Sequence, residues 1–217
     1  MISSLFARAI IPLAPVAAAT LAAQNSYGLL TLTPLPGWLE GLIAFVLLDL
    51  LIYMQHRLFH AVPVLWRLHR THHTDLELDV TSGVRFHPAE IVFSLIIKIM
   101  AVMALGAPPM AVLIFEIVLN ATSLFNHANA ALPVRIDGLL RMVLVTPSMH
   151  RVHHSIVKAE TDSNFGFNLP WWDKMFGTYR AAPAAGPDAV TLGIDNFRQA
   201  GDSRLDRLLI QPFVSKP

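Results

Sequence analysis

The residues of this chain whose types and spacing could do chemistry are its histidines. The 217-residue chain has ten, all between residues 56 and 154: His56 and His60; His69, His72 and His73; His87; His127; and His150, His153 and His154. A single histidine in an apolar stretch is usually a core residue, but side chains three or four residues apart share a helical face. Two neutral imidazoles so placed can bind one metal ion. Because a zinc site uses only four ligands, ten histidines predict a site for two metal ions.

One motif occurs twice. His69 to His73 and His150 to His154 both read His-Arg-x-His-His, and each offers three nitrogens on a helix, so we interpret them as paired half-sites. The chain has no cysteine, which excludes thiolate zinc sites, iron–sulfur clusters and disulfides. Nitrogen and oxygen ligands remain, and imidazole suits iron, zinc, copper and nickel alike.

The composition indicates which elements must position these histidines. Hydrophobic residues make up 54% of the chain and charged residues 14%, against about 25% charged in a soluble domain; the mean hydropathy is +0.51. This is typical of a membrane protein, and residues 1–217 are predicted to form a single domain. The net charge of +1 gives no indication of a nucleic-acid partner.

Four apolar runs predict an all-α, multi-pass protein of about four transmembrane or re-entrant helices. They are residues 5–23, 38–54, 89–105 and 110–126. The first, interrupted by Pro12 and Pro15, is interpreted as a span, with a signal peptide as the alternative. The last two would each be about 25 Å long, which fits a shallow hairpin as well as two full spans.

Three of the charged residues within these runs lie well away from the ends of their runs. Asp49 stands two helical turns before His56, and is either an acceptor for an imidazole N–H or a helix-packing group. Lys98 and Glu116 lie at similar distances from the Gly-Ala-Pro-Pro turn, so we expect them to form a buried ion pair.

The distribution of basic residues predicts the orientation. Ten of the sixteen lysines and arginines follow residue 126, whereas the loops at 24–37 and 106–109 have none. By the positive-inside rule, the histidine groups form a helical cap on the cytoplasmic face.

Together, these groups resemble the fatty acid hydroxylase/sterol desaturase superfamily of membrane di-iron oxygenases, over about residues 49–179. The resemblance rests on the histidine motifs and their flanks: Arg85-Phe-His-Pro-x-Glu90, Asn126-His-Ala-Asn129, Thr146-Pro-x-x-His150, and Asn164-Phe-Gly with Trp172-Asp-x-x-Phe-Gly-Thr178. It implies two iron ions held by the histidines, for which zinc can substitute in purified protein. It also implies dioxygen as co-substrate and hydroxylation or desaturation of a lipid.

The resemblance carries nine histidines over as ligands, and His87 has two possible roles. Some fatty acid hydroxylases of the superfamily have a second histidine four residues after the equivalent of His127, where this chain has Ala131. We expect His87 to complete the ligand set; the alternative is that it caps the helix starting at Pro88. Since the sequence has no nucleotide-binding motif, electrons are expected from an external donor, such as a cytochrome b5-like protein, a ferredoxin or a reductase.

Two other functions use the same residues. A zinc-dependent membrane hydrolase would need a carboxylate or a hydroxyl beside the metal. The carboxylates Asp75, Glu77 and Asp79 share no helical spacing with the histidines. A metal transporter would place its ligands near the bilayer midplane, whereas these flank the apolar runs. The lipid itself, whether sterol, fatty acyl chain or isoprenoid, is not specified by the sequence.

Overall fold

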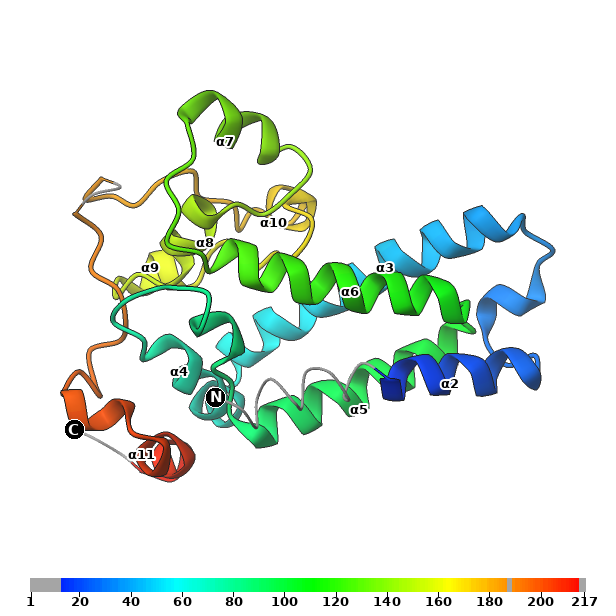
Figure 1. Ribbon diagram of the computed structural model, residues 1–217, viewed down its shortest axis with the longest axis horizontal. Helices are drawn as coiled ribbons and strands as arrows, with labels where there is room; N and C mark the ends of the chain where they lie inside the picture. The colour runs from blue at the N-terminus through cyan, green and yellow to red at the C-terminus, as the bar shows by residue number, and fades with distance from the viewer. Residues whose placement is uncertain (1–12, 187–188, 215–217) are drawn as a thin grey trace. The chain divides into compact units, whose positions relative to one another are not determined.

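The computed structural model describes residues 13–186 and 189–214, and its regular structure is helical (Figure 1). Within these ranges there is no strand beyond one isolated bridge between Ser155 and Leu192. The all-α prediction is confirmed.

The α-helices are α2 (Leu13–Gln24), α3 (Gly37–Ala61), α4 (Pro63–His73), α5 (Pro88–Leu105), α6 (Pro109–Asn126), α7 (Val134–Leu140), α8 (Pro147–His153), α9 (Lys158–Thr161), α10 (Trp171–Met175) and α11 (Leu205–Ile210). The short 3-10 helices are η1 (Leu29–Leu32), η2 (Ser82–Val84), η4 (Ala200–Ser203) and η5 (Gln211–Phe213).

Three described helices, α3, α5 and α6, are long and apolar enough to cross a membrane. Their apolar side chains are largely exposed, as at Ile96, Met100 and Ile117, which suits helices whose surroundings are lipid rather than water. The predicted span at 5–23 falls partly on residues 1–12, which lie outside the described residues. Its described part is the twelve-residue α2.

The chain forms two compact units, each built from two separate stretches, residues 1–52 with 91–121 and residues 53–90 with 122–217. In the first unit, Gly28 and Gly106 both have positive φ and approach so closely that a Cβ on Gly28 would lie 2.0 Å from the Gly106 nitrogen. Glycine is therefore required at both positions. This contact brings the two uncharged loops together.

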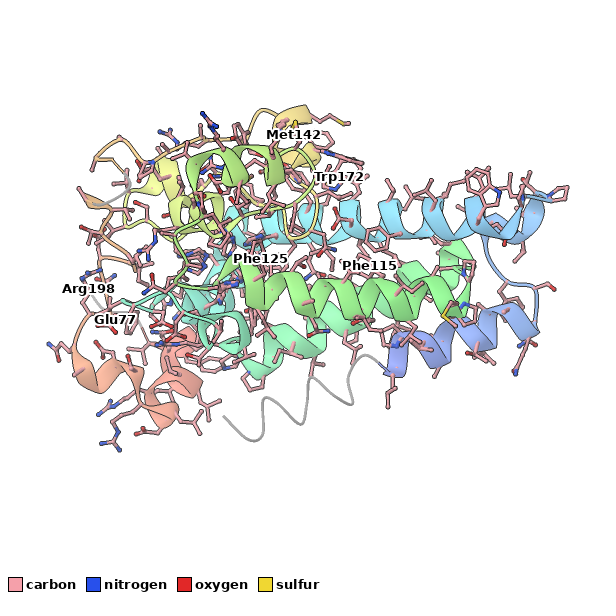
Figure 2. All side chains as sticks on the ribbon, turned by 45° about the horizontal axis from the view of Figure 1, so that its top comes forward. Glu77, Phe115, Phe125, Met142, Trp172 and Arg198 are labelled. Carbon is pink, nitrogen blue, oxygen red and sulfur yellow. The ribbon has the colours of Figure 1, made fainter. Side chains whose placement is uncertain are left out.

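The predicted ion pair lies in this first unit. The Nζ atom of Lys98 on α5 is 2.6 Å from Oε1 of Glu116 on α6, and both side chains are buried. The adjacent Phe115, also on α6, packs edge-on against Phe45 with ring centroids 5.4 Å apart (Figure 2). The expectation of a paired lysine and glutamate within the hairpin is confirmed.

The second unit contains α4, η2, α7 to α11, η4 and η5, and all ten histidines. Its C-terminal segment packs on α4, where Arg70 donates to the carbonyls of Gln211 and Val214 and Arg67 donates to that of Pro212. Trp171 on α10 donates from its indole nitrogen to the carbonyl of Met142, beside Trp172, which is buried (Figure 2). These contacts join sequence-distant segments around the histidine-bearing helices α4 and α8.

Candidate metal centre

Nine of the ten histidines gather in two clusters within the second unit. In each cluster the potential ligand atoms all lie within 4.8 Å of one another. The five-histidine cluster consists of His56, His60, His69, His73 and His153. The four-histidine cluster consists of His72, His127, His150 and His154.

Each His-Arg-x-His-His motif is divided between the two clusters. On α4, His69 and His73, four residues apart, join the five-histidine cluster, while His72 joins the other. The second motif does the reverse, because His150 and His154 join the four-histidine cluster and His153 the five-histidine one. The two motifs, which we interpreted as paired half-sites, therefore do not each make one cluster. Each helix contributes to both clusters, because adjacent residues project about 100° apart around its axis.

The ring nitrogens converge as metal ligands would. In the four-histidine cluster, the Nε2 atom of His127 lies 3.1 Å from that of His72 and 2.9 Å from that of His150. In the other, the Nε2 atoms of His56 and His69 are 3.1 Å apart. Nitrogens bound at about 2.0–2.1 Å to one ion stand roughly 3 Å apart. The spacing of the donor atoms fits a shared ion in each cluster.

The clusters also leave buried nitrogen atoms without a hydrogen bond. They include Nε2 of His60, both nitrogens of His73 and Nε2 of His153. Buried polar atoms are normally paired, and a metal ion would satisfy the one lone pair that each neutral ring offers. The donor set of neutral imidazoles is one that iron accepts.

Backbone carbonyls orient four of the nine rings. The Nδ1 atoms of His56, His127 and His153 donate to the carbonyls of Phe165, Ser123 and Ser163 at 2.6–2.8 Å. His72 makes a longer bond, 3.3 Å, to the Arg85 carbonyl. Because a carbonyl can only accept, the proton is on Nδ1 and the lone pair is on Nε2, which faces the cluster.

Two rings are supported by carboxylates instead. Nδ1 of His69 lies 2.6 Å from Oε1 of the buried Glu90, and Nδ1 of His60 lies 3.2 Å from Oδ1 of Asp162. The sequence motif contained Glu90, but an acidic residue in the first turn of a helix is also favoured by the helix dipole, so its second role was missed. No spacing signal connected Asp162 to His60.

A buried aspartate holds the segment that supports two of the ligands. Asp173 accepts hydrogen bonds from the Phe165 and Gly166 backbone N–H groups at 2.8 and 2.7 Å, and from the Thr178 hydroxyl. A Cβ on Gly166 would meet the Asp173 carboxylate at 2.8 Å, so glycine is required there. This segment carries the carbonyl that fixes His56, which gives a physical reason for the Asn-Phe-Gly and Trp-Asp motifs.

Burial keeps five of the histidines in the two repeated motifs neutral. It lowers the pKa of His72, His73, His150 and His154 well below 6.5, and the neighbouring imidazoles lower it further. Burial also lowers the pKa of His153 to about 3. Neutral imidazole is the form that binds metal.

The structure does not bring His87 into either cluster, in contrast to our expectation that it would complete the ligand set. Its Nδ1 accepts the Ala89 backbone N–H at 3.1 Å, and its Nε2 donates to the Leu209 carbonyl at 3.1 Å. His87 thus caps the start of α5, and both nitrogens are used by backbone groups. Ala131 lies beyond the end of α6 at Asn126 and is exposed, so it is not one helical turn from His127.

The acidic residues considered for a hydrolase have other partners. Asp75 pairs with Arg85 and accepts a hydrogen bond from Ser82, and Asp79 binds Thr81. Glu77, together with Arg151 and Arg198, lines an open pocket of about 380 Å³ (Figure 2). None of the nine cluster histidines lines that pocket, so it is separate from the metal centre.

Comparison with known proteins gives a family match. The family model described as fatty acid hydroxylase matches residues 41–178. The chain is 33% identical over 177 residues to the ornithine lipid hydroxylase OlsE of Rhizobium tropici, covering 82% of this chain and 51% of the relative. It is 32% identical over 138 residues to the alkylglycerol monooxygenase of Homo sapiens, covering 64% and 30%. It is 28% identical over 143 residues to the cholesterol 25-hydroxylase of Rattus norvegicus, covering 65% and 47%.

The chain thus spans about half the length of the first relative and about a third of the second. No solved structure shows significant similarity to it.

Proposed function

We propose, because this chain belongs to the fatty acid hydroxylase family, that it is a membrane-bound di-iron oxygenase which hydroxylates a lipid. The observation that carries the proposal is the pair of buried clusters made only of histidine, nine in all. We include all nine as ligands and leave His87 out, since both of its nitrogens are bonded to backbone groups. The helices α3, α5 and α6 each run through both compact units, so we treat residues 1–217 as one functional domain.

Iron bound in these clusters would supply the activation of dioxygen. The chain's own residues orient the ligands. Carbonyls and carboxylates fix the orientations of the imidazole rings, and burial excludes water from the rings. Insertion of one oxygen atom into a C–H bond yields an alcohol and a water molecule and consumes two electrons and two protons. We propose that an external redox protein supplies the electrons, because the sequence has no nucleotide-binding motif.

The names of the relatives support a lipid substrate and favour hydroxylation over desaturation. They describe a hydroxylase of ornithine lipid, a monooxygenase of alkylglycerol and a 25-hydroxylase of cholesterol. The three have a lipid in common, and none is named as a desaturase. We therefore propose a membrane lipid as the substrate class and oxygen insertion as the reaction.

We further propose that the metal centre faces the cytoplasm. The excess of basic residues after residue 126 supports this orientation, and so does the contact between the two uncharged loops at Gly28 and Gly106. Because the chain has no cysteine, single introduced cysteines can show which loops face the outside of the cell. In whole cells, an impermeant thiol reagent should label Thr33→Cys and leave Glu77→Cys unlabelled; the reverse pattern would overturn the orientation.

Metal analysis with oxygen consumption tests the proposed function. Protein produced with iron supplementation should contain two irons and take up oxygen when given a reductant and membrane lipid. A protein that retains only zinc under these conditions and hydrolyses a lipid ester without oxygen would support the zinc hydrolase instead. Comparing the lipids of a deletion strain and its parent by mass spectrometry then identifies the product, since hydroxylation adds one oxygen and desaturation removes two hydrogens.

A further inference from the structure

The two clusters differ in the groups behind their histidines. In the five-histidine cluster, His69 and His60 contact carboxylates, Glu90 at 2.6 Å and Asp162 at 3.2 Å. In the four-histidine cluster, His72 and His127 donate to backbone carbonyls. Among the residues that the structure describes, no ion pair joins a carboxylate to His72, His150 or His154.

This difference changes the electrostatics of a bound cation. Neutral imidazoles alone leave the charge of a buried metal ion uncompensated, and a carboxylate behind a ligand both compensates that charge and makes the imidazole more basic. Interactions between charges are stronger where water is excluded. The five-histidine cluster therefore has a more favourable environment for a cation, and it also has one ligand more.

The two carboxylates are unequal. The side chain of Glu90 is 7% exposed, whereas that of Asp162 is 38% exposed. Asp162 also pairs with Lys158 at 3.1 Å, which offsets part of its negative charge. Solvent and this lysine weaken the effect of Asp162, so Glu90 is the main source of the asymmetry.

We propose that the clusters bind metal in a fixed order, the five-histidine cluster first and more tightly, with Glu90 as the positioning residue that sets the order through His69. The inference rests on the proposed function only in that both clusters bind metal. Glu90 needs no contact with lipid or dioxygen for this role.

The order of metal binding is tested by measuring the metal affinities of the full chain, without any measurement of turnover. Metal-free protein in detergent is titrated anaerobically with Fe(II) in competition with a chelator, and the parent should show two steps of different affinity. Glu90→Gln keeps the size of the side chain and removes its charge. It should weaken the tighter step about 10–100-fold, as is typical for groups behind metal-bound histidines, and leave the weaker step unchanged. Asp162→Asn should have a smaller effect on the same step.

Glu160→Gln is the matched control. Glu160 is also buried, in the same unit, and its carboxylate accepts the Ala184 backbone N–H instead of a histidine. This variant should keep both affinities. Equal losses in Glu90→Gln and Glu160→Gln, or a single affinity for both ions in the parent, would overturn the proposal.

Cluster variants assign the two steps. His154→Ala, in the four-histidine cluster, should keep the tighter step, and His73→Ala, in the five-histidine cluster, should keep only the weaker one. Mössbauer spectra of the parent and Glu90→Gln with one and two equivalents of ⁵⁷Fe(II) give the same assignment with every ligand present. Glu90→Gln should change the signal of the first equivalent and not the one added by the second; the opposite result would contradict the order.

These outcomes separate the inference from the proposed function. Ordered binding of two ions without any lipid oxygenation would refute the function and leave the order standing. Lipid oxygenation by a protein whose two ions bind with equal affinity would refute the order alone.

Discussion

His72 and His73 are consecutive residues whose rings, with centroids 5.4 Å apart and planes 88° apart, belong to different metal clusters. One turn of α4 therefore links the two sites. The same division occurs at His153, the last residue of α8, and His154, which follows it, with rings 86° apart. Two helices that each supply both clusters fix the separation of the two sites, which a pair of independent half-sites would not do.

This division predicts that the two neighbours affect different ions. His73→Ala should lose the ion of the five-histidine cluster, and His72→Ala that of the four-histidine cluster, so that each variant retains one ion. Turnover should fall by more than about 100-fold in both, beyond the range for groups outside the first ligand shell. Metal content and lipid turnover of the purified variants measure this. Two ions with normal turnover in either variant would contradict the assignment.

His87 is predicted to be structural. His87→Asn should keep both ions and most of the lipid turnover, because an asparagine side chain can also accept the N–H at the start of α5, at a stability loss of about 1 kcal/mol or less. His127→Asn, measured beside it, should lose metal and turnover, since His127 lies within the four-histidine cluster. If His87→Asn loses metal as His127→Asn does, the site has ten ligands.

The ion pair between Lys98 and Glu116 should contribute to stability as a pair. Lys98→Met leaves Glu116 buried without its cation and should destabilise the protein by about 3–5 kcal/mol, whereas Lys98→Met with Glu116→Leu should be nearly neutral. Unfolding of the parent and both variants in the same detergent compares them. A single variant as stable as the double one would show that the pair has no energetic coupling.

The lowered histidine pKa values predict acid sensitivity of the metal-free protein. Unfolded histidines take up protons as the pH falls through about 6.5. In the folded protein, burial lowers the pKa of His72, His73, His150 and His154 well below this value and that of His153 to about 3. The contribution of these neutral rings to the free energy of unfolding is therefore complete above about pH 7. It decreases as the pH falls from 6.5 toward 3, because the unfolded chain binds more protons than the folded one. Melting temperatures of metal-free protein at pH 8, 6.5 and 5 should decrease in that order. A melting temperature that stays constant down to pH 5 would contradict the burial of neutral rings.

Much of the helical fold was predictable because membrane helices need long apolar runs. The predicted runs at 38–54, 89–105 and 110–126 lie within α3, α5 and α6. The Lys98–Glu116 pair followed from equal distances to a turn. The histidines were also predictable as a group, since their spacing is regular.

The distribution of ligands between clusters was not predictable in the same way. It depends on how α4 and α8 are rotated about their axes relative to each other, which a linear spacing does not contain. The supporting groups were equally hidden. Asp162 is far from His60 in sequence, and Asp173 acts through backbone N–H groups, which have no sequence signature. His87 shares the residue type of the ligands, and only its hydrogen bonds to Ala89 and Leu209 distinguish its role.

The most direct test of the central claim, that the two histidine clusters support oxygen insertion into a lipid, is isotope incorporation. Membranes containing the protein or His153→Ala are supplied with ¹⁸O₂ and a reducing system, and their lipids are analysed by mass spectrometry. The account predicts a lipid that gains one ¹⁸O atom with the parent protein and not with His153→Ala. Equal labelling in both samples, or a product whose new oxygen comes from water, would contradict it.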